Sequence, residues 1–236
     1  MIARFRILWE RFLAFRRSPR KFIVTIALAV LVLILGIYSI RTGRSRQKLV
    51  YAESLDLVAV SVNGSELTLR DLAFYVAYEE QEVYKEALVY DADDPKKYWN
   101  LHIDGVFVAD AARNAAIQMA IHDELFYRMA VADEGTLSEE ERAAMESSEE
   151  DFWNDLCDED QTDRLGITRE DLHRTMERIA LAQRYQTIYA LSRGEAYEEY
   201  AFSEEAYEAY RDKQKIKIAD QVWNRVDIGS VTLSYE

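Results

Sequence analysis

The sequence predicts a mainly α protein, in which an N-terminal transmembrane helix precedes a helical domain whose two ends form a small sheet. Three observations support this fold class. The stretch 22–40 contains no charged residue. Most of the remaining chain shows helix start signals followed by apolar residues at helical spacing. Alternating residues typical of strands occur near the two ends of the domain, at 58–68 and 216–233.

The segment 22–40 has the length of a membrane-spanning helix. Its 19 residues rise about 1.5 Å each and span about 28 Å, close to the roughly 30 Å hydrocarbon core of a bilayer. Seven Lys and Arg residues precede it, and four follow it up to position 48. The positive-inside rule therefore predicts a cytoplasmic basic arm at 1–21 and an extracytoplasmic remainder. A cleaved signal peptide is the alternative, and GIYSIRTG offers a poor small-residue cleavage site for it.

Charge separates the chain into two parts. Residues 49–236 contain 18 basic and 42 acidic residues, which gives a formal net charge of −24. Such a balance argues against binding nucleic acid, whose phosphates require Lys and Arg. It permits basic polypeptide partners, loosely held divalent cations or simple solubility. The one cysteine, Cys157, excludes an intramolecular disulfide, and its acidic neighbours disfavour a reactive thiolate.

The sequence of the first part of the extracytoplasmic region predicts a stalk followed by a hairpin. Residues 41–56 are expected to be the stalk, and 57–236 the domain. Val58 to Val62 alternate as a strand does, and Asn63-Gly64 suits a two-residue type I′ turn. Thr68 is a good helix N-cap, with Asp71 as its capping-box partner. That helix is expected to end near Val89, before DADDP.

Further helices are predicted from similar signals. A helical pattern runs from about Tyr98 to Ala132, with Gly135 as its C′ residue. Ser138 caps a helix that reaches Leu156, Thr168 caps another, and a short helix follows Ser203. The segments 216–218 and 226–233 read as strands. Because isolated strands are unstable, we expect the tail to pair with 58–62 in a small sheet on the helices.

Three segments carry a family resemblance. VAVSVNGSELTLRDL resembles the V-x-V-N-G-x-x-I/L-T-x-x-D/E-L opening of the SurA/PrsA-type foldases. RNAAIQMAIHDELFYRMAVADEGTLSEEERAA is similar to the long helix, glycine turn and S/T-x-E-E of that family, and LGITREDLHRTMERIALAQRYQ to its G-x-T-x-E-D-L helix. The resemblance covers 57–72, 111–145 and 165–190. It implies a SurA N-like helical domain, which would be a chaperone-like module for unfolded or exported chains. The chain stops about where a parvulin prolyl-isomerase domain begins in family members, so we expect no isomerase activity.

No catalytic motif stands out. His102, His122 and His173 lack metal-site spacing, and neither a nucleophile elbow nor a glycine-rich phosphate loop is present. Three acidic triplets, at 139–141, 149–151 and 158–160, do not follow an EF-hand pattern, and solvated helix faces explain them. We therefore expect no enzyme activity, no cofactor and no metal. Aromatic side chains such as tyrosine supply rigid amphipathic contact area, so a client-binding surface is predicted. Core packing is the alternative role for these rings. The residues predicted to contact clients are Tyr75, Tyr78, Tyr84 and Trp99.

Two functions remain open at this stage. The first is a single-pass, membrane-anchored, extracytoplasmic chaperone-like module that binds unfolded or secreted polypeptides. The second is a non-catalytic interaction subunit of a membrane protein complex. Many weakly bound clients would favour the first function, and one stoichiometric partner the second.

Overall fold

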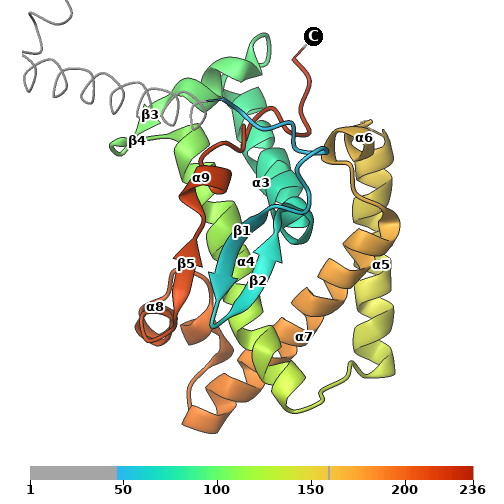
Figure 1. Cartoon of the computed structure of the whole chain (residues 1–236), viewed down its shortest axis with the longest axis vertical. Coiled ribbons are helices and arrows are strands. Elements are labelled where there is room, and N and C mark those ends of the chain that lie inside the picture. Colours follow the sequence, from blue (N-terminus) through green and yellow to red (C-terminus); the bar gives the residue numbers. More distant parts are fainter. Residues whose placement is uncertain (1–46, 159, 236) are drawn as a thin grey trace, which may run out of the picture. The chain divides into compact units, whose positions relative to one another are not determined.

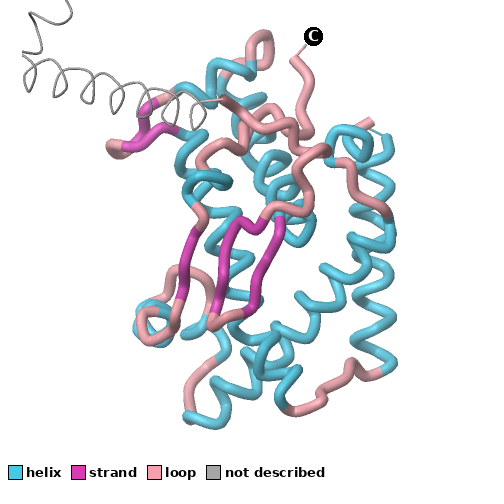
Figure 2. Tube along the Cα trace, viewed as in Figure 1, coloured by secondary structure: helices cyan, strands magenta, loops and turns pink. Residues whose placement is uncertain are grey.

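Helices make up most of the domain, and two small sheets complete it (Figures 1 and 2). The structure is a computed structural model that describes residues 47–158 and 160–235. Lys48–Glu236 form one compact unit. The mainly α prediction is thus confirmed for the domain. The predicted arm 1–21 and transmembrane segment 22–40 lie outside the described residues, and no helix within those residues is long and apolar enough to cross a bilayer.

The elements follow one another in this order: β1 (Val58–Val62), β2 (Ser65–Thr68), α3 (Leu69–Tyr90), η1 (Pro95–Asn100), β3 (His102–Ile103), β4 (Val106–Phe107), α4 (Val108–Ala132), α5 (Glu139–Asp158), α6 (Gln161–Leu165), α7 (Arg169–Arg193), η2 (Tyr197–Tyr200), α8 (Glu205–Arg211), β5 (Ile216–Ile218) and α9 (Asp220–Trp223).

The main sheet confirms that the two ends of the domain meet. Its strand order is β2-β1-β5, and both neighbours of β1 run antiparallel to it. Val60 pairs with Leu67 on one side and with Ile218 on the other. The turn between β1 and β2 has φ values of 52° at Asn63 and 90° at Gly64. Positive φ at both positions is what a type I′ turn requires, so the predicted hairpin is confirmed.

Three of the predicted helix starts are also confirmed. Thr68 and Thr168 cap α3 and α7, each in a complete capping box with the Asp three residues later, Asp71 and Asp171. Ahead of α5, the Ser138 amide donates to the Glu141 carboxylate at 2.7 Å, and the Glu141 amide donates to the Ser138 hydroxyl at 3.2 Å. Each box satisfies amides that the first turn leaves without a partner.

The end of α4 differs by one residue from the prediction. Glu134, with φ of 53°, holds the left-handed C′ position that was assigned to Gly135. The Gly135 amide then donates to Ala130 O at 2.8 Å, and the Glu134 amide to Val131 O at 3.3 Å, which is a Schellman motif. Gly135 is needed for a different reason, because a Cβ there would collide with the ring of Tyr185.

Two further predictions about secondary structure are wrong. The helix expected from Tyr98 begins only at Val108, because η1 and the β3–β4 hairpin occupy the preceding residues. The hairpin turns at Asp104-Gly105, whose φ values of 51° and 89° are again those of a type I′ turn. The strand expected at 226–233 is an irregular segment, since amides there donate to the buried carboxylate of Glu80 instead of to a neighbouring strand.

The core lies where α3, α4 and α7 pack together under the main sheet (Figure 1). Part of the segment expected to be a stalk belongs to this core. Tyr51 and Leu55 are buried, and the Tyr51 hydroxyl donates to Leu69 O at 2.6 Å. The largest fully buried apolar side chains come chiefly from these helices: Leu69, Leu72, Ile117, Ile121, Leu125, Phe126 and Leu172.

Candidate functional site

Helices α5 and α7 lie side by side in opposite directions, and polar contacts join them at two places. Towards the start of α5, Glu141 accepts from Arg184 at 2.7 Å. Two turns further along α5, the buried carboxylate of Glu149 accepts from Arg169 at 3.0 Å and from His173 at 2.5 Å. These contacts hold the two helices at a fixed spacing.

An open groove of about 530 Å³ lies along this helix pair. Its lining combines apolar side chains with small and polar ones. Ala144 and Ser148 on α5 and Ala180 on α7 are short, so the space above them is not filled. Met145 and Met176 are unbranched and adapt to ligands of different shapes. The complete lining is Glu141, Ala144, Met145, Ser148, Met176, Ile179, Ala180, Gln183, Arg184, Thr187 and Tyr197.

The face of α7 that lines the groove continues beyond it. Leu191 follows Thr187 by four residues and Arg184 by seven, so it lies on the same face of the helix. It is 70% exposed. Ile188 and Tyr197 are also exposed near this end of the groove. An open surface with apolar side chains is therefore available to a partner next to the groove.

Carboxylates at the groove are ionised at neutral pH. Burial on its own would raise the pKa of Glu149, but hydrogen bonds from His173 and Arg169 lower it below its ordinary value. Hydrogen bonds from the backbone and side chain of Ser138 lower the pKa of Glu141. The outer face of α5 adds a group of exposed acidic residues: Glu139, Glu140, Glu146, Glu150, Asp151 and Asp155. The groove is thus an apolar surface beside negative charge.

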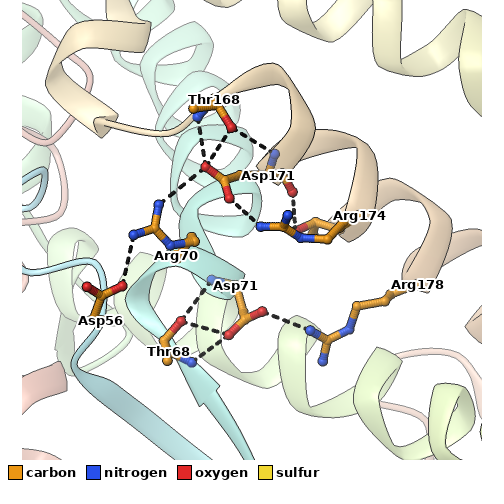
Figure 3. A network of polar contacts seen from close by, with 9 residues as sticks. Asp56, Thr68, Arg70, Asp71, Thr168, Asp171, Arg174 and Arg178 are labelled. Carbon is orange, nitrogen blue, oxygen red and sulfur yellow. Dashed lines mark hydrogen bonds and ion pairs between the residues drawn. The ribbon is translucent and has the colours of Figure 1, made fainter.

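A polar network between α3 and α7 fixes the position of the helix that carries the groove (Figure 3). Arg70 of α3 reaches Asp171, the capping-box aspartate of α7, at 3.3 Å. In return, Arg178 of α7 reaches Asp71, the capping-box aspartate of α3, at 2.9 Å, and also Glu124 of α4 at 2.5 Å. Each arginine therefore links its own helix to the capping box of the other helix.

The residues of this network leave little free space between them. The cavity beside Arg178, Glu124 and Tyr75 measures about 10 Å³, which is room for about one water molecule and not for a substrate. Of the histidines, His102 is exposed on the β3–β4 hairpin, and His122 lies between Asp123 and Tyr200 O. No cluster of His, Cys, Asp or Glu within residues 47–158 and 160–235 is arranged to hold a metal ion.

The four aromatic residues predicted to contact clients do not meet on one surface. The Tyr75 ring is buried, and its hydroxyl donates to Asp123 at 2.9 Å. Trp99 is buried, and Tyr84 is half-buried with its edge against another ring. Tyr78 is the exposed member, at 40%, and its ring stacks on Phe74. None of the four lines the α5–α7 groove.

The groove was missed by reasoning from the sequence. A signal was present, since Met176 and Ala180 stand one turn apart on α7, and Ala144 and Ser148 one turn apart on α5. Small residues at helical spacing on two helices leave space between them only if those faces meet, and the sequence does not indicate which faces meet. Comparisons of the chain with protein-family models, with curated proteins and with solved structures each gave no match.

Proposed function

We propose that this domain binds exposed apolar segments of unfolded or exported polypeptides in the α5–α7 groove, and that it does so without catalysis. The predicted span 22–40 would hold the domain at a membrane, outside the cytoplasm. The proposal joins the expectation from the sequence to one structural observation. That observation is the open groove with two methionines and an isoleucine, continued by the exposed side chain of Leu191.

The size and charge of the groove support a particular kind of client. A volume of about 530 Å³ accepts a few side chains of an extended or helical segment, and not a folded domain. Acidic residues on α5 attract positive charge through solvent over about 8–10 Å at physiological salt. We therefore expect the preferred segments to have apolar residues flanked by Lys or Arg, and their binding to weaken partly, not completely, at high salt.

The test measures binding of an unfolded polypeptide to residues 48–236, which contain the whole described core. The probe is a fluorescently labelled unfolded peptide in which apolar residues are flanked by Lys. Leu191→Glu places a charge on the exposed apolar face and should weaken binding several-fold. Val89→Glu is the matched control, because Val89 is 89% exposed on α3 and does not line the groove. Unchanged binding by Leu191→Glu, or no binding by the parent domain, contradicts the proposal.

Three further measurements separate this function from the alternatives. Aggregation of a secreted client should slow at stoichiometric amounts of the domain, and isomerisation of a proline-containing peptide should not accelerate. Purification of the full chain from membranes should bring down many clients in small amounts. A single partner in equal amount would instead identify an interaction subunit of a membrane complex.

A further inference from the structure

The β3–β4 hairpin exposes apolar side chains on both of its strands. Ile103, Val106 and Phe107 are 46%, 47% and 49% exposed, and His102, which completes the four strand residues, is exposed as well. The Asp104-Gly105 turn forms the tip. A hairpin of two short strands is marginally stable by itself, and three apolar residues in water contribute little to it. A surface of this kind is typical of a contact site.

The hairpin lies next to the place where the chain enters the domain. Lys48 and Phe107 line the same open pocket of about 500 Å³. The start of the domain is fixed there, because Lys48 pairs with Asp227 at 3.0 Å and the Leu49 amide donates to Arg225 O at 2.9 Å. In Figure 1 the hairpin projects from the end of the domain at which the described chain begins.

The length of chain between the predicted span and Lys48 limits how far the hairpin can lie from a membrane. From Ile40 to Lys48 the chain takes eight residue steps, and at 3.3–3.6 Å each they reach at most about 29 Å. If the span ends at Ile40, as the sequence predicts, Lys48 stays within that distance of the bilayer surface. Phe107, which shares a pocket with Lys48, stays near it as well.

We propose that the β3–β4 hairpin rests in the interfacial layer of the same bilayer that the segment 22–40 crosses. Aromatic and aliphatic side chains gain from partial burial at the boundary between headgroups and acyl chains. Asp104 at the tip keeps the insertion shallow, because a carboxylate remains at the level of the headgroups. The hairpin and the tether would then hold the domain in one orientation above the membrane. This inference rests on the anchoring part of the proposed function and is independent of the groove.

The experiment uses the full chain in phosphatidylcholine vesicles, with Cys157→Ser to remove the native thiol. An environment-sensitive nitrobenzoxadiazole label is placed at Val106→Cys on the hairpin or, as a matched control, at Leu191→Cys on α7. We expect blue-shifted emission from the hairpin label and its quenching by lipids brominated along the acyl chain. The label at position 191 should emit as in water and should not be quenched.

Each other outcome counts against the inference. Emission as in water from position 106 would show that the hairpin does not touch lipid. A blue shift without quenching would mean contact with protein, such as a second copy of the chain, in place of lipid. Release of the full chain from the vesicles by alkaline carbonate would remove the anchor on which the inference rests, whereas the binding assay on residues 48–236 would still report on the groove.

Discussion

The carboxylate of Glu80 on α3 accepts two hydrogen bonds from Thr232, one from its amide at 2.7 Å and one from its hydroxyl at 2.5 Å. The amides of Gly229 and Val231 donate to the other carboxylate oxygen at 2.5 and 3.0 Å. Glu80 is fully buried. Burial raises the pKa of this carboxyl, and the hydrogen bonds from the C-terminal segment oppose that rise. A segment without regular secondary structure is thereby fixed to a helix.

The contacts of Glu80 predict a large effect on stability. Glu80→Ala leaves four buried donors without an acceptor, and it should lower the free energy of unfolding by about 3 kcal/mol or more. Glu82→Ala is the control on the same helix, because its side chain is exposed and pairs with Lys85, so it should cost less than about 1 kcal/mol. Urea denaturation of residues 48–236 measures both variants. Equal losses would show that the Glu80 contacts do not stabilise the fold.

The raised pKa of Glu79 predicts that the stability of the domain depends on pH. Burial, with the nearby carboxylates of Glu82 and Glu86, raises the pKa of Glu79 from 4.5 to about 7. The folded chain therefore holds this proton at pH values where the unfolded chain has lost it, so the contribution of Glu79 to stability falls as pH rises through that range. Glu79→Gln should stabilise the domain at pH 8 by roughly 1–2 kcal/mol and have little effect at pH 4.5.

The measurement for Glu79 is the difference in unfolding free energy between parent and Glu79→Gln at several pH values. Other carboxylates cancel in that difference as long as they are not coupled to Glu79. A constant difference across pH 4.5 to 8 would contradict the prediction.

The contacts of Arg178 predict how much free energy of unfolding is lost when the network between the helices is broken. Its side chain neutralises Glu124, whose own side chain is 1% exposed, and also bonds Asp71. Arg178→Met leaves a buried carboxylate without its cation and should cost about 3–5 kcal/mol. Arg174→Met, one turn earlier on α7, is the control. Its partner Asp171 keeps Arg70, so the loss should stay below about 1 kcal/mol. A similar loss in both variants would contradict a special role for Arg178.

The lowered pKa of Glu149 predicts that acid weakens the contact between α5 and α7 beside the groove. Because its pKa is lowered in the folded chain, the stability that it contributes is present above about pH 4.5 and is lost as pH falls through the lower folded value. Amides of α5 should then exchange with deuterium faster at low pH, relative to those of α4. Glu149→Gln should already show faster exchange in α5 at pH 7. Uniform acceleration over both helices would mean global unfolding instead.

Local signals in the sequence predicted much of the fold. The Thr68 and Thr168 capping boxes and the Asn63-Gly64 turn each depend on residues within three or four positions, and the structure confirms them. The pairing of β1 with the tail could be predicted because no other strand pattern had been recognised. The Asp104-Gly105 turn carried the same kind of signal as Asn63-Gly64 but was read as part of a helix.

The remaining features depend on contacts between distant residues. Glu80 lies 149 to 152 positions from its partners, and the spacing of apolar residues does not indicate that pairing. The buried Tyr75 and Trp99 show a related limit, because an aromatic side chain has the same sequence pattern whether it packs in the core or faces a ligand. The groove formed by α5 and α7 could likewise be recognised only once their packing was known.

Strand β1 lies between β2, its immediate neighbour in the chain, and β5, which begins at Ile216. During translation, the ribosome makes β1 and β2 early and β5 only after most of the chain. Until then one edge of β1 has no partner and can pair with other nascent chains. The carboxylate of Glu80 lacks its hydrogen-bond partner Thr232 for longer still, because Thr232 is synthesised after β5. We therefore expect slow, late folding, governed by closure of a very large loop, and a need for protection of the growing chain from aggregation.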